Sequence, residues 1–352
     1  MHNRTRGLTR RTALASSAAG LVCLTIPSAA MARGNGENDM NSTTQGFLRY
    51  EAEEIEFNSA GEVLRGVLCA PHGSGRVPAI VVLGPFGFVK EQAPMQYATR
   101  LAQRGFATLA FDTRFSGASG GAPRRLESPE AKIADARAAI DWLASHARVD
   151  AHRIGALGIC QGASEMIAVA ADDARIRTLA LVSGQYLYRE NLEKFFGGGG
   201  PTLDDRIERG RKALAAYKDS GVVEYGAVVD PQDKSVALPW PPINDWYQPW
   251  TSLKWGQRGR WENRYAIMSD AEVWSFDVDR FAERLTVPTL LLHGEQSDGG
   301  VEAVSHVHQR VGSKEKRMSI VDGVFHTRFY DDPRVVEPAA AEVADWLAAH
   351  LT

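Results

Sequence analysis

The feature that most constrains this chain is a five-residue run, GICQG, at positions 158–162. It follows an apolar run at 153–157 that predicts a strand, and it precedes an alanine-rich run at 163–171 that predicts a helix. A sharp turn from strand to helix strains the backbone of its central residue, so the flanking positions must lack Cβ atoms. The pattern predicts a nucleophile elbow centred on Cys160, with a buried cysteine at a tight turn as the alternative. At a helix N-terminus, backbone N–H groups and the helix dipole are expected to favour the Cys160 thiolate.

Strands and helices are expected to alternate along most of the chain after residue 46. Runs at 50–57 and 63–69, separated by NSAG, predict an opening β-hairpin. Later segments predict strands at 79–83, 106–111, 153–159, 178–183, 288–293 and 317–321, and helices at 91–104, 129–145, 163–171, 301–311 and 336–351. This alternation predicts an α/β fold with a mainly parallel central sheet covered by helices on both faces.

Residues 185–275 interrupt the alternation. They hold six of the eight tryptophans, at positions 240, 246, 250, 255, 261 and 274. We expect a cap inserted over the active-site edge of the sheet, within a domain that spans 47–352. The aromatic side chains would either line an apolar substrate pocket or form the core of the cap itself.

The first 32 residues have the composition of an export signal rather than of a folded segment. The pair Arg10-Arg11 precedes an apolar run at 13–26, and an A-x-A cleavage pattern ends at Ala32. The arginine pair resembles a twin-arginine signal, with an ordinary secretory signal as the alternative. The apolar run is too short for a good membrane span, so no stable membrane anchor is expected. Residues 33–46 are polar and predict a flexible linker, and the mature protein is expected to be periplasmic or secreted.

Charge and cysteine usage exclude several classes of partner. The net charge of −3 becomes −7 once a signal containing four arginines is removed, and such a mildly acidic protein has no basic stripe for nucleic acid. Of the three cysteines, Cys23 leaves with the signal, while Cys69 and Cys160 lie in separate predicted elements. No disulfide between those two is expected. Two distant cysteines also form no metal-binding pattern, so we expect no metal and no cofactor.

Candidates for an acid and a base follow the elbow in the order nucleophile, acid, base. His326 lies just after the last predicted strand and is the candidate base; the alternative is an ordinary surface histidine. Asp298 is the candidate acid because it has the H-G-x-x-x-D spacing from His293, and Glu295 is the fallback. His293 itself ends a buried strand, and we interpret it as structural.

Two backbone N–H groups are candidates for an oxyanion hole. One belongs to Gln161, the residue after the nucleophile. The other is expected in the run GPFG at 84–87, which ends the third predicted strand. Because Pro85 has no N–H, Phe86 is the expected donor, with Gly87 as a second choice. The alternative is that the run is only a structural turn.

Together, the elbow, Asp298, His326 and the run at 84–87 resemble the α/β-hydrolase superfamily. The cysteine nucleophile resembles its dienelactone-hydrolase-like branch. The resemblance implies an α/β-hydrolase fold and a Cys160–Asp298–His326 triad. Dienelactone hydrolases carry a glutamate near the oxyanion strand that controls the resting thiol, whereas this chain has Gly84 and Pro85 there. The export signal and the large insertion also depart from that branch, so dienelactone itself is not the expected substrate.

These features lead to one principal functional hypothesis and two alternatives. The principal hypothesis is a hydrolase of small-molecule esters, lactones or thioesters that forms an acyl-thioester on Cys160. An acyltransferase would use the same triad but pass the acyl group to an alcohol or amine. A non-catalytic binding protein on a hydrolase scaffold is the alternative from a different class.

Overall fold

The computed structural model describes residues 47–252 and 260–352, which belong to one compact unit, Gly46–Thr352. The predicted signal at 1–32, the predicted linker at 33–46 and Trp255 lie outside the described residues.

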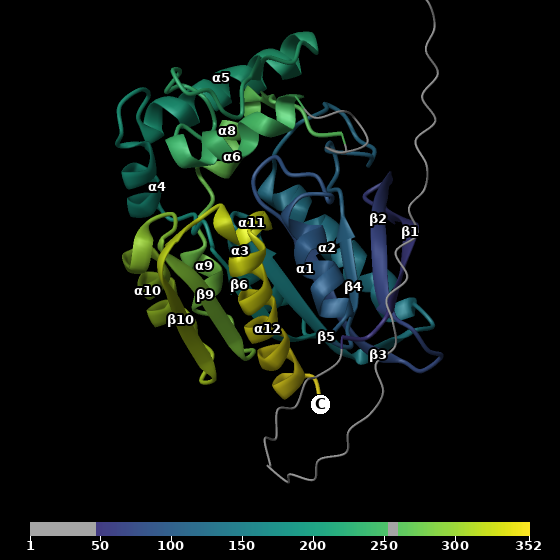
Figure 1. Cartoon of the computed structure of the whole chain (residues 1–352). Helices are drawn as coiled ribbons and strands as arrows, with labels where there is room; N and C mark the ends of the chain where they lie inside the picture. The colour runs from purple at the N-terminus through teal and green to yellow at the C-terminus, as the bar shows by residue number, and fades with distance from the viewer. Residues whose placement is uncertain (1–46, 253–259) are drawn as a thin grey trace, which may run out of the picture. The chain divides into compact units, whose positions relative to one another are not determined.

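A central sheet of eight strands organises the unit (Figure 1). In spatial order the strands are β1 (Tyr50–Ser59), β2 (Glu62–Pro71), β4 (Ala107–Phe111), β3 (Val77–Leu83), β5 (Val149–Ile159), β6 (Ile176–Val182), β9 (Thr289–Gln296) and β10 (Lys316–Phe325). The first two strands form an antiparallel hairpin, and β2 pairs antiparallel with β4. From β4 to β10 every neighbouring pair is parallel. The predicted α/β-hydrolase fold, with its mainly parallel sheet, is confirmed.

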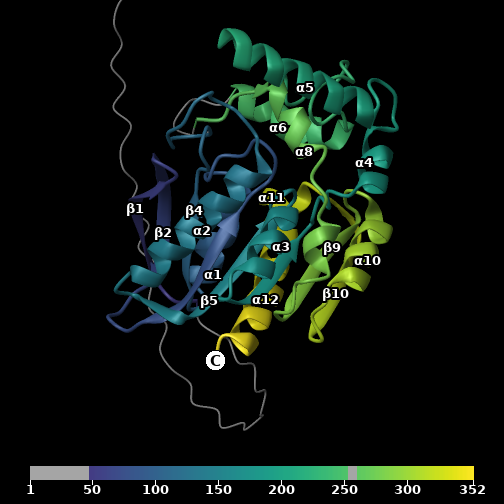
Figure 2. The same cartoon turned by 180° about the vertical axis from the view of Figure 1, so that it is seen from behind.

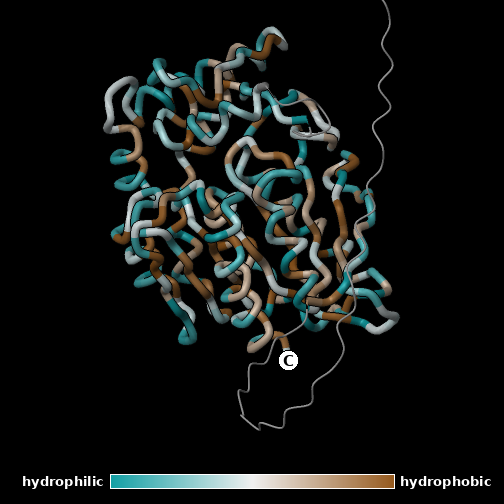
Figure 3. Tube along the Cα trace, viewed as in Figure 1, coloured by the Kyte–Doolittle hydropathy of each residue, from teal (hydrophilic) through white to brown (hydrophobic). Residues whose placement is uncertain are grey.

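Helices cover both faces of the sheet because its central strands are apolar on both sides (Figures 2 and 3). On β3, Val81 and Leu83 join one buried cluster, whereas Ile80 and Val82 join the other. This period of two is that of a strand buried on both faces. The first cluster is completed by helices α2 (Pro129–Ser145), α3 (Gly162–Asp172), α9 (Asp279–Ala282) and α10 (Gly300–Arg310). The second is completed by α1 (Ala93–Ala102), α11 (Arg328–Asp331) and α12 (Pro333–His350).

A helical segment between β6 and β9 lies beyond the carboxyl ends of the parallel strands (Figure 1). We call this segment the helical insert; it consists of α4 (Arg189–Phe196), α5 (Leu203–Ser220), β7 (Tyr225–Gly226), α6 (Pro241–Ser252), β8 (Tyr265–Ala266), the 3₁₀ turn Ile267–Ser269 and α8 (Asp270–Val273). Its buried core contains Trp261 and Trp274, against which Trp240, Trp246 and Trp250 pack. The described tryptophans of the insert therefore form its core, and three of them, Trp240, Trp246 and Trp274, also reach the site described below.

The strand before the candidate base is longer than its sequence pattern predicts. The apolar run ends at Val321, but β10 continues to Phe325. Its register against β9 shifts between Val321 and Phe325, and Gly323 there has a positive φ of 64°. A bulge of this kind re-aims the end of a strand. It places His326 directly after β10.

Close packing at the turn between β5 and α3 explains the two glycines of the elbow. Cys160 has a left-handed φ of 56°. A Cβ at Gly158 would come within 2.5 Å of the Gly162 carbonyl oxygen, and one at Gly162 within 2.6 Å of the Leu83 carbonyl oxygen. Because both obstacles are backbone atoms, no side-chain rearrangement could relieve the contacts. Glycine is required at both positions.

Candidate active site

The Cys160 sulfur lies at the carboxyl end of β5 under the helical insert. Cys160 is 4% exposed to solvent. The backbone N–H groups of Gln161 and Phe86 donate hydrogen bonds to the thiol, so the structure brings together the nucleophile and both first-choice oxyanion donors. The Cys160 N–H donates to the Val182 carbonyl at 3.2 Å, which fixes the elbow to β6.

Burial controls the protonation state of this thiol. It raises the pKa of Cys160 to about 12, and the Asp298 charge acts in the same direction. Hydrogen bonds from Tyr330, Gln161 and Phe86 lower the pKa but do not outweigh burial. The Gln161 N–H at the start of α3 favours the thiolate as expected, but burial outweighs it, so the neutral thiol is the favoured resting form of Cys160.

Phe86, the residue that supplies the second N–H donor, is held by contacts to its carbonyl, its ring and the preceding carbonyl. The Tyr247 hydroxyl, from α6 of the insert, donates to the Phe86 carbonyl at 3.0 Å. The Phe86 ring stacks on Trp274 at a centroid distance of 5.7 Å. Lys132 Nζ lies 3.5 Å from the Pro85 carbonyl oxygen, which belongs to the same peptide group as the Phe86 N–H. A cation at that oxygen polarises the peptide and strengthens its N–H as a donor.

Lys132 belongs to a buried ionic cluster that sequence reasoning missed. Its Nζ lies 2.5 Å from a Glu127 carboxylate oxygen and 3.9 Å from one of Glu165. Burial lowers the pKa of Lys132, but these two carboxylates raise it further, so the ammonium stays charged. Glu165 also accepts a 2.7 Å hydrogen bond from the Gln161 side chain. The cluster thus contacts the Gln161 side chain and the peptide group that contains the Phe86 N–H.

His326 is fully buried and has partners on both ring nitrogens. Its Nδ1 accepts from the Asp298 backbone N–H at 3.3 Å and lies 3.0 Å from the Ser183 hydroxyl. Its Nε2 lies 3.0 Å from the Tyr330 hydroxyl. Burial, with a smaller contribution from His293, lowers the pKa of His326 to about 3. The imidazole is therefore neutral at rest, as a general base must be.

Of the two candidate acids, the structure places Asp298 beside His326. The Asp298 carboxylate accepts from the Asn191 side chain at 3.4 Å, and burial raises its pKa to about 7. Its hydrogen bond to His326 comes from the main chain. Glu295 is exposed and accepts from the Gly323 N–H at 2.8 Å.

His293 and Cys69, the other two residues considered in the sequence analysis, are both buried. His293 is buried within β9, and its ring stacks against Tyr186 at 5.9 Å. Burial lowers the pKa of His293 to about 4, so it too is neutral. Cys69 is a free thiol buried in β2, separate from the elbow.

Two hydroxyl groups in the site had no clear signal in the sequence. Ser183 follows β6, and its hydroxyl is hydrogen-bonded to His326 Nδ1. The hydroxyl of Tyr330 on α11 is hydrogen-bonded to His326 Nε2 and to the Cys160 thiol. Tyr330 lies only four residues after His326, across the turn that precedes α11, and that short spacing could have suggested the contact. The Trp246 ring of the insert packs edge-on against Tyr330 at 4.9 Å.

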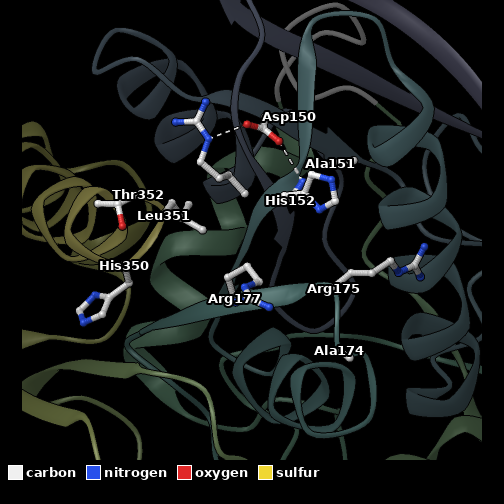
Figure 4. Close-up of a pocket in the computed structure, with 10 residues that line it drawn as sticks. Asp150, Ala151, His152, Ala174, Arg175, Arg177, His350, Leu351 and Thr352 are labelled. Atoms are coloured by element: carbon white, nitrogen blue, oxygen red, sulfur yellow. Dashed lines mark hydrogen bonds and ion pairs between the residues drawn. The ribbon is translucent and has the colours of Figure 1, made fainter.

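Two hollows lie at opposite ends of the unit. One of about 250 Å³ is lined in part by Asp298, Trp240 and Asn191, and the Trp240 ring lies 6.3 Å from the His326 ring. This hollow therefore adjoins the candidate site. The larger one, of about 700 Å³ and lined by residues that include His152 and Arg177, lies at the amino ends of β5 and β6, away from the elbow (Figure 4).

Within residues 47–252 and 260–352, no three histidine, cysteine, aspartate or glutamate side chains are grouped so that they could hold a metal ion. No helix in the same ranges combines the length and apolar character needed to cross a membrane.

Comparison with known proteins identifies the family. A model of the X-Pro dipeptidyl-peptidase (S15) family matches residues 61–327. The chain belongs to this family. Protein YcjY of Escherichia coli strain K12 is 33% identical over 284 residues, which cover 78% of this chain and 89% of YcjY. The crystal structure of hypothetical protein PA2218 from Pseudomonas aeruginosa superposes with a TM-score of 0.73 and 25% identity, covering 90% of this chain and 100% of PA2218.

A shorter similarity extends to the thiohydrolase aneE of Aspergillus aculeatus, which is 31% identical over 171 residues, or 48% of this chain and 51% of aneE. Family membership and fold together support a hydrolase-type function.

Burial predicts slow alkylation of both described thiols. Burial raises the pKa of Cys69 to about 11 and that of Cys160 to about 12, and only the thiolate reacts readily. In the folded protein near neutral pH, iodoacetamide is expected to modify both cysteines slowly, whereas guanidinium-unfolded protein reacts fast at both. Peptide mass spectrometry over time measures the two rates. Rapid, selective alkylation of Cys160 in the folded protein would contradict a neutral resting thiol.

Proposed function

We propose that this protein hydrolyses carboxylic esters, lactones or thioesters, with Cys160 as nucleophile and His326 as base. The observation that carries the proposal is the convergence of the Gln161 and Phe86 N–H groups on the Cys160 sulfur. Two backbone donors at a nucleophile match the requirement of acyl transfer, in which a carbonyl oxygen acquires negative charge next to the attacked carbon. The short similarity to a protein named a thiohydrolase supports the inclusion of thioesters.

The reaction follows from these groups. The Cys160 thiol loses its proton toward His326 as the sulfur attacks the substrate carbonyl carbon. The carbonyl oxygen becomes an oxyanion that accepts hydrogen bonds from Gln161 and Phe86. The protonated His326 then gives its proton to the leaving alcohol or thiol, which leaves an acyl-thioester on Cys160. A water that loses a proton to His326 attacks this thioester, and the carboxylic acid and the free thiol are released.

The dienelactone-hydrolase-like branch remains a proposal that rests on the cysteine elbow. That branch has a glutamate near the oxyanion strand, and this chain has none in the run at 84–87. Its nearby buried glutamates, Glu127 and Glu165, instead pair with Lys132, which contacts the run at 84–87, here called the oxyanion loop. We therefore propose the shared nucleophile chemistry without the shared substrate.

Replacement of the nucleophile tests the proposal directly. Cys160→Ala is expected to abolish hydrolysis of p-nitrophenyl acetate while leaving the thermal melt nearly unchanged, because only one sulfur atom is removed from a packed turn. Cys69→Ala is the matched control, since it removes the other buried thiol at a distance from the elbow. Turnover retained by Cys160→Ala would refute the nucleophile. A wild-type protein without turnover on esters, lactones and thioesters would favour the binding-protein alternative.

Acyl transfer is a second candidate because the site is closed. Cys160 is 4% exposed and His326 is fully buried beneath the helical insert, so an acyl-thioester would be shielded from bulk water. We expect hydrolysis to dominate, so an added alcohol or amine should leave the ratio of products unchanged. Chromatography of the products with and without acceptor measures this ratio. Formation of an acyl-acceptor product at the expense of free acid would assign transfer instead.

We also propose that residues 1–32 direct export by the twin-arginine route, on the basis of Arg10-Arg11 and the apolar run that follows. A route that carries folded protein would bury Cys160 before it meets an oxidising compartment.

Replacement of the arginine pair tests this route. Arg10→Lys combined with Arg11→Lys is expected to retain the folded, active precursor in the cytoplasm. Arg4→Lys combined with Arg6→Lys is the matched control and should be exported. Cell fractionation and mass spectrometry of the mature N-terminus, expected at Arg33, give the result. Normal export of the double variant at positions 10 and 11 would refute the route.

A further inference from the structure

The side chain of Tyr330 stands between the candidate nucleophile and the candidate base. Its hydroxyl lies 3.0 Å from His326 Nε2 and is also hydrogen-bonded to the Cys160 thiol. The residue is fully buried on α11, and the Trp246 ring of the insert packs against it at 4.9 Å. The hydroxyl is therefore held in one place, within reach of both reacting groups.

The partners of His326 define where its ring proton lies. The Asp298 backbone N–H can only donate, so when it bonds Nδ1 the ring proton is on Nε2 and points to the Tyr330 oxygen. In the other tautomer, Nδ1 donates to the Ser183 hydroxyl at 3.0 Å, and Nε2 is free to accept. Ser183 can then donate to the Ser297 hydroxyl, 2.9 Å away. The Nδ1–H tautomer gives up the hydrogen bond from the Asp298 N–H and gains the Ser183 hydroxyl as an acceptor in its place.

We propose that Tyr330 is a catalytic residue that relays the proton from Cys160 to His326. This inference rests on the proposed nucleophile and base. With His326 in the Nδ1–H tautomer, the sulfur–hydrogen bond breaks and its proton binds the Tyr330 oxygen. The original hydroxyl proton of Tyr330 moves to Nε2 in the same step. The step leaves the Cys160 sulfur bonded to the substrate carbonyl carbon. His326 is then an imidazolium, and Tyr330 is again a neutral phenol.

Two features of the site support a relay in which both protons move together. Burial, reinforced by the neighbouring Cys160, raises the pKa of Tyr330 well above its usual value, so a free tyrosinate is disfavoured. After transfer, the Tyr330 hydroxyl carries the former thiol proton and donates it in a hydrogen bond to the sulfur, as the Gln161 and Phe86 N–H groups do. The same path runs backward when the thiol is released at the end of the cycle.

The variant Tyr330→Phe tests the relay because it removes the hydroxyl and keeps the ring. Its kcat/KM for p-nitrophenyl acetate is expected to fall by about 10²-fold or more, the usual contribution of a positioned proton-transfer group. Tyr97→Phe is the matched control: the Tyr97 hydroxyl is also buried and holds the same helix through the Phe329 carbonyl at 3.0 Å. This control should lose stability in a thermal melt yet keep the wild-type rate. A Tyr330→Phe variant within about threefold of the wild-type rate, or faster, would overturn the relay.

A measurement on the unaltered protein keeps the proposal testable even if Tyr330→Phe does not fold. A two-proton step predicts that kcat/KM falls along a downward-bowed curve as the deuterium fraction of the solvent rises, and a straight line would overturn the relay. Failure of the relay is distinguishable from failure of the proposed function. If turnover requires Cys160 but is insensitive to loss of the Tyr330 hydroxyl, only the relay is wrong.

Discussion

The left-handed backbone of Cys160 is the constraint around which the site is arranged. It turns the chain sharply from β5 into α3 and requires α3 to begin against the end of β3. The Gly162 N–H donates to the Gly84 carbonyl at 3.1 Å, and this hydrogen bond joins the elbow to the oxyanion loop. Gln161 directly precedes Gly162, and Phe86 follows Gly84 by two residues. The distance between the two oxyanion donors is therefore set by the close approach that glycine alone permits.

Buried charged side chains next to the oxyanion loop and the elbow polarise and position the Gln161 and Phe86 N–H donors. Burying an ammonium and a carboxylate is costly unless they compensate one another, and Lys132 and Glu127 do so at 2.5 Å. Burial raises the pKa of Glu165, 3.9 Å from Lys132, to about 7. The cluster directs positive charge at the Pro85 carbonyl, and it anchors the Gln161 side chain through Glu165. Preorganised dipoles of this kind stabilise charge in the transition state without having to reorient during the reaction.

The sequence was informative wherever local chemistry decides structure. Glycine spacing locates the elbow, the lack of an N–H at Pro85 selects Phe86, and alternation of apolar runs predicts the sheet. The order of elements brings His326 and Asp298 to the same edge, because the carboxyl ends of parallel strands meet there. These inferences need no knowledge of how side chains pack.

What the sequence could not predict depends on contacts between distant segments. Lys132 looks like a surface lysine in an amphipathic helix, and its burial is set by the oxyanion loop and the elbow. The bulge in β10, which positions His326, has no signal beyond Gly323. The same limit explains why a neutral resting thiol was not expected: the N–H groups that favour the thiolate are local, whereas the burial that outweighs them is a property of the whole fold.

Burial of both reacting groups also constrains the order of the chemical steps. Burial raises the pKa of Cys160 to about 12 and lowers that of His326 to about 3, so each shift keeps the proton on sulfur. A preformed thiolate–imidazolium pair is disfavoured at rest. Proton transfer becomes favourable only as sulfur bonds to carbon and the negative charge moves to the oxygen held by Gln161 and Phe86. The resting thiol is consequently protected from oxidants and alkylating agents, which react with thiolates, and it is activated by the substrate that it attacks.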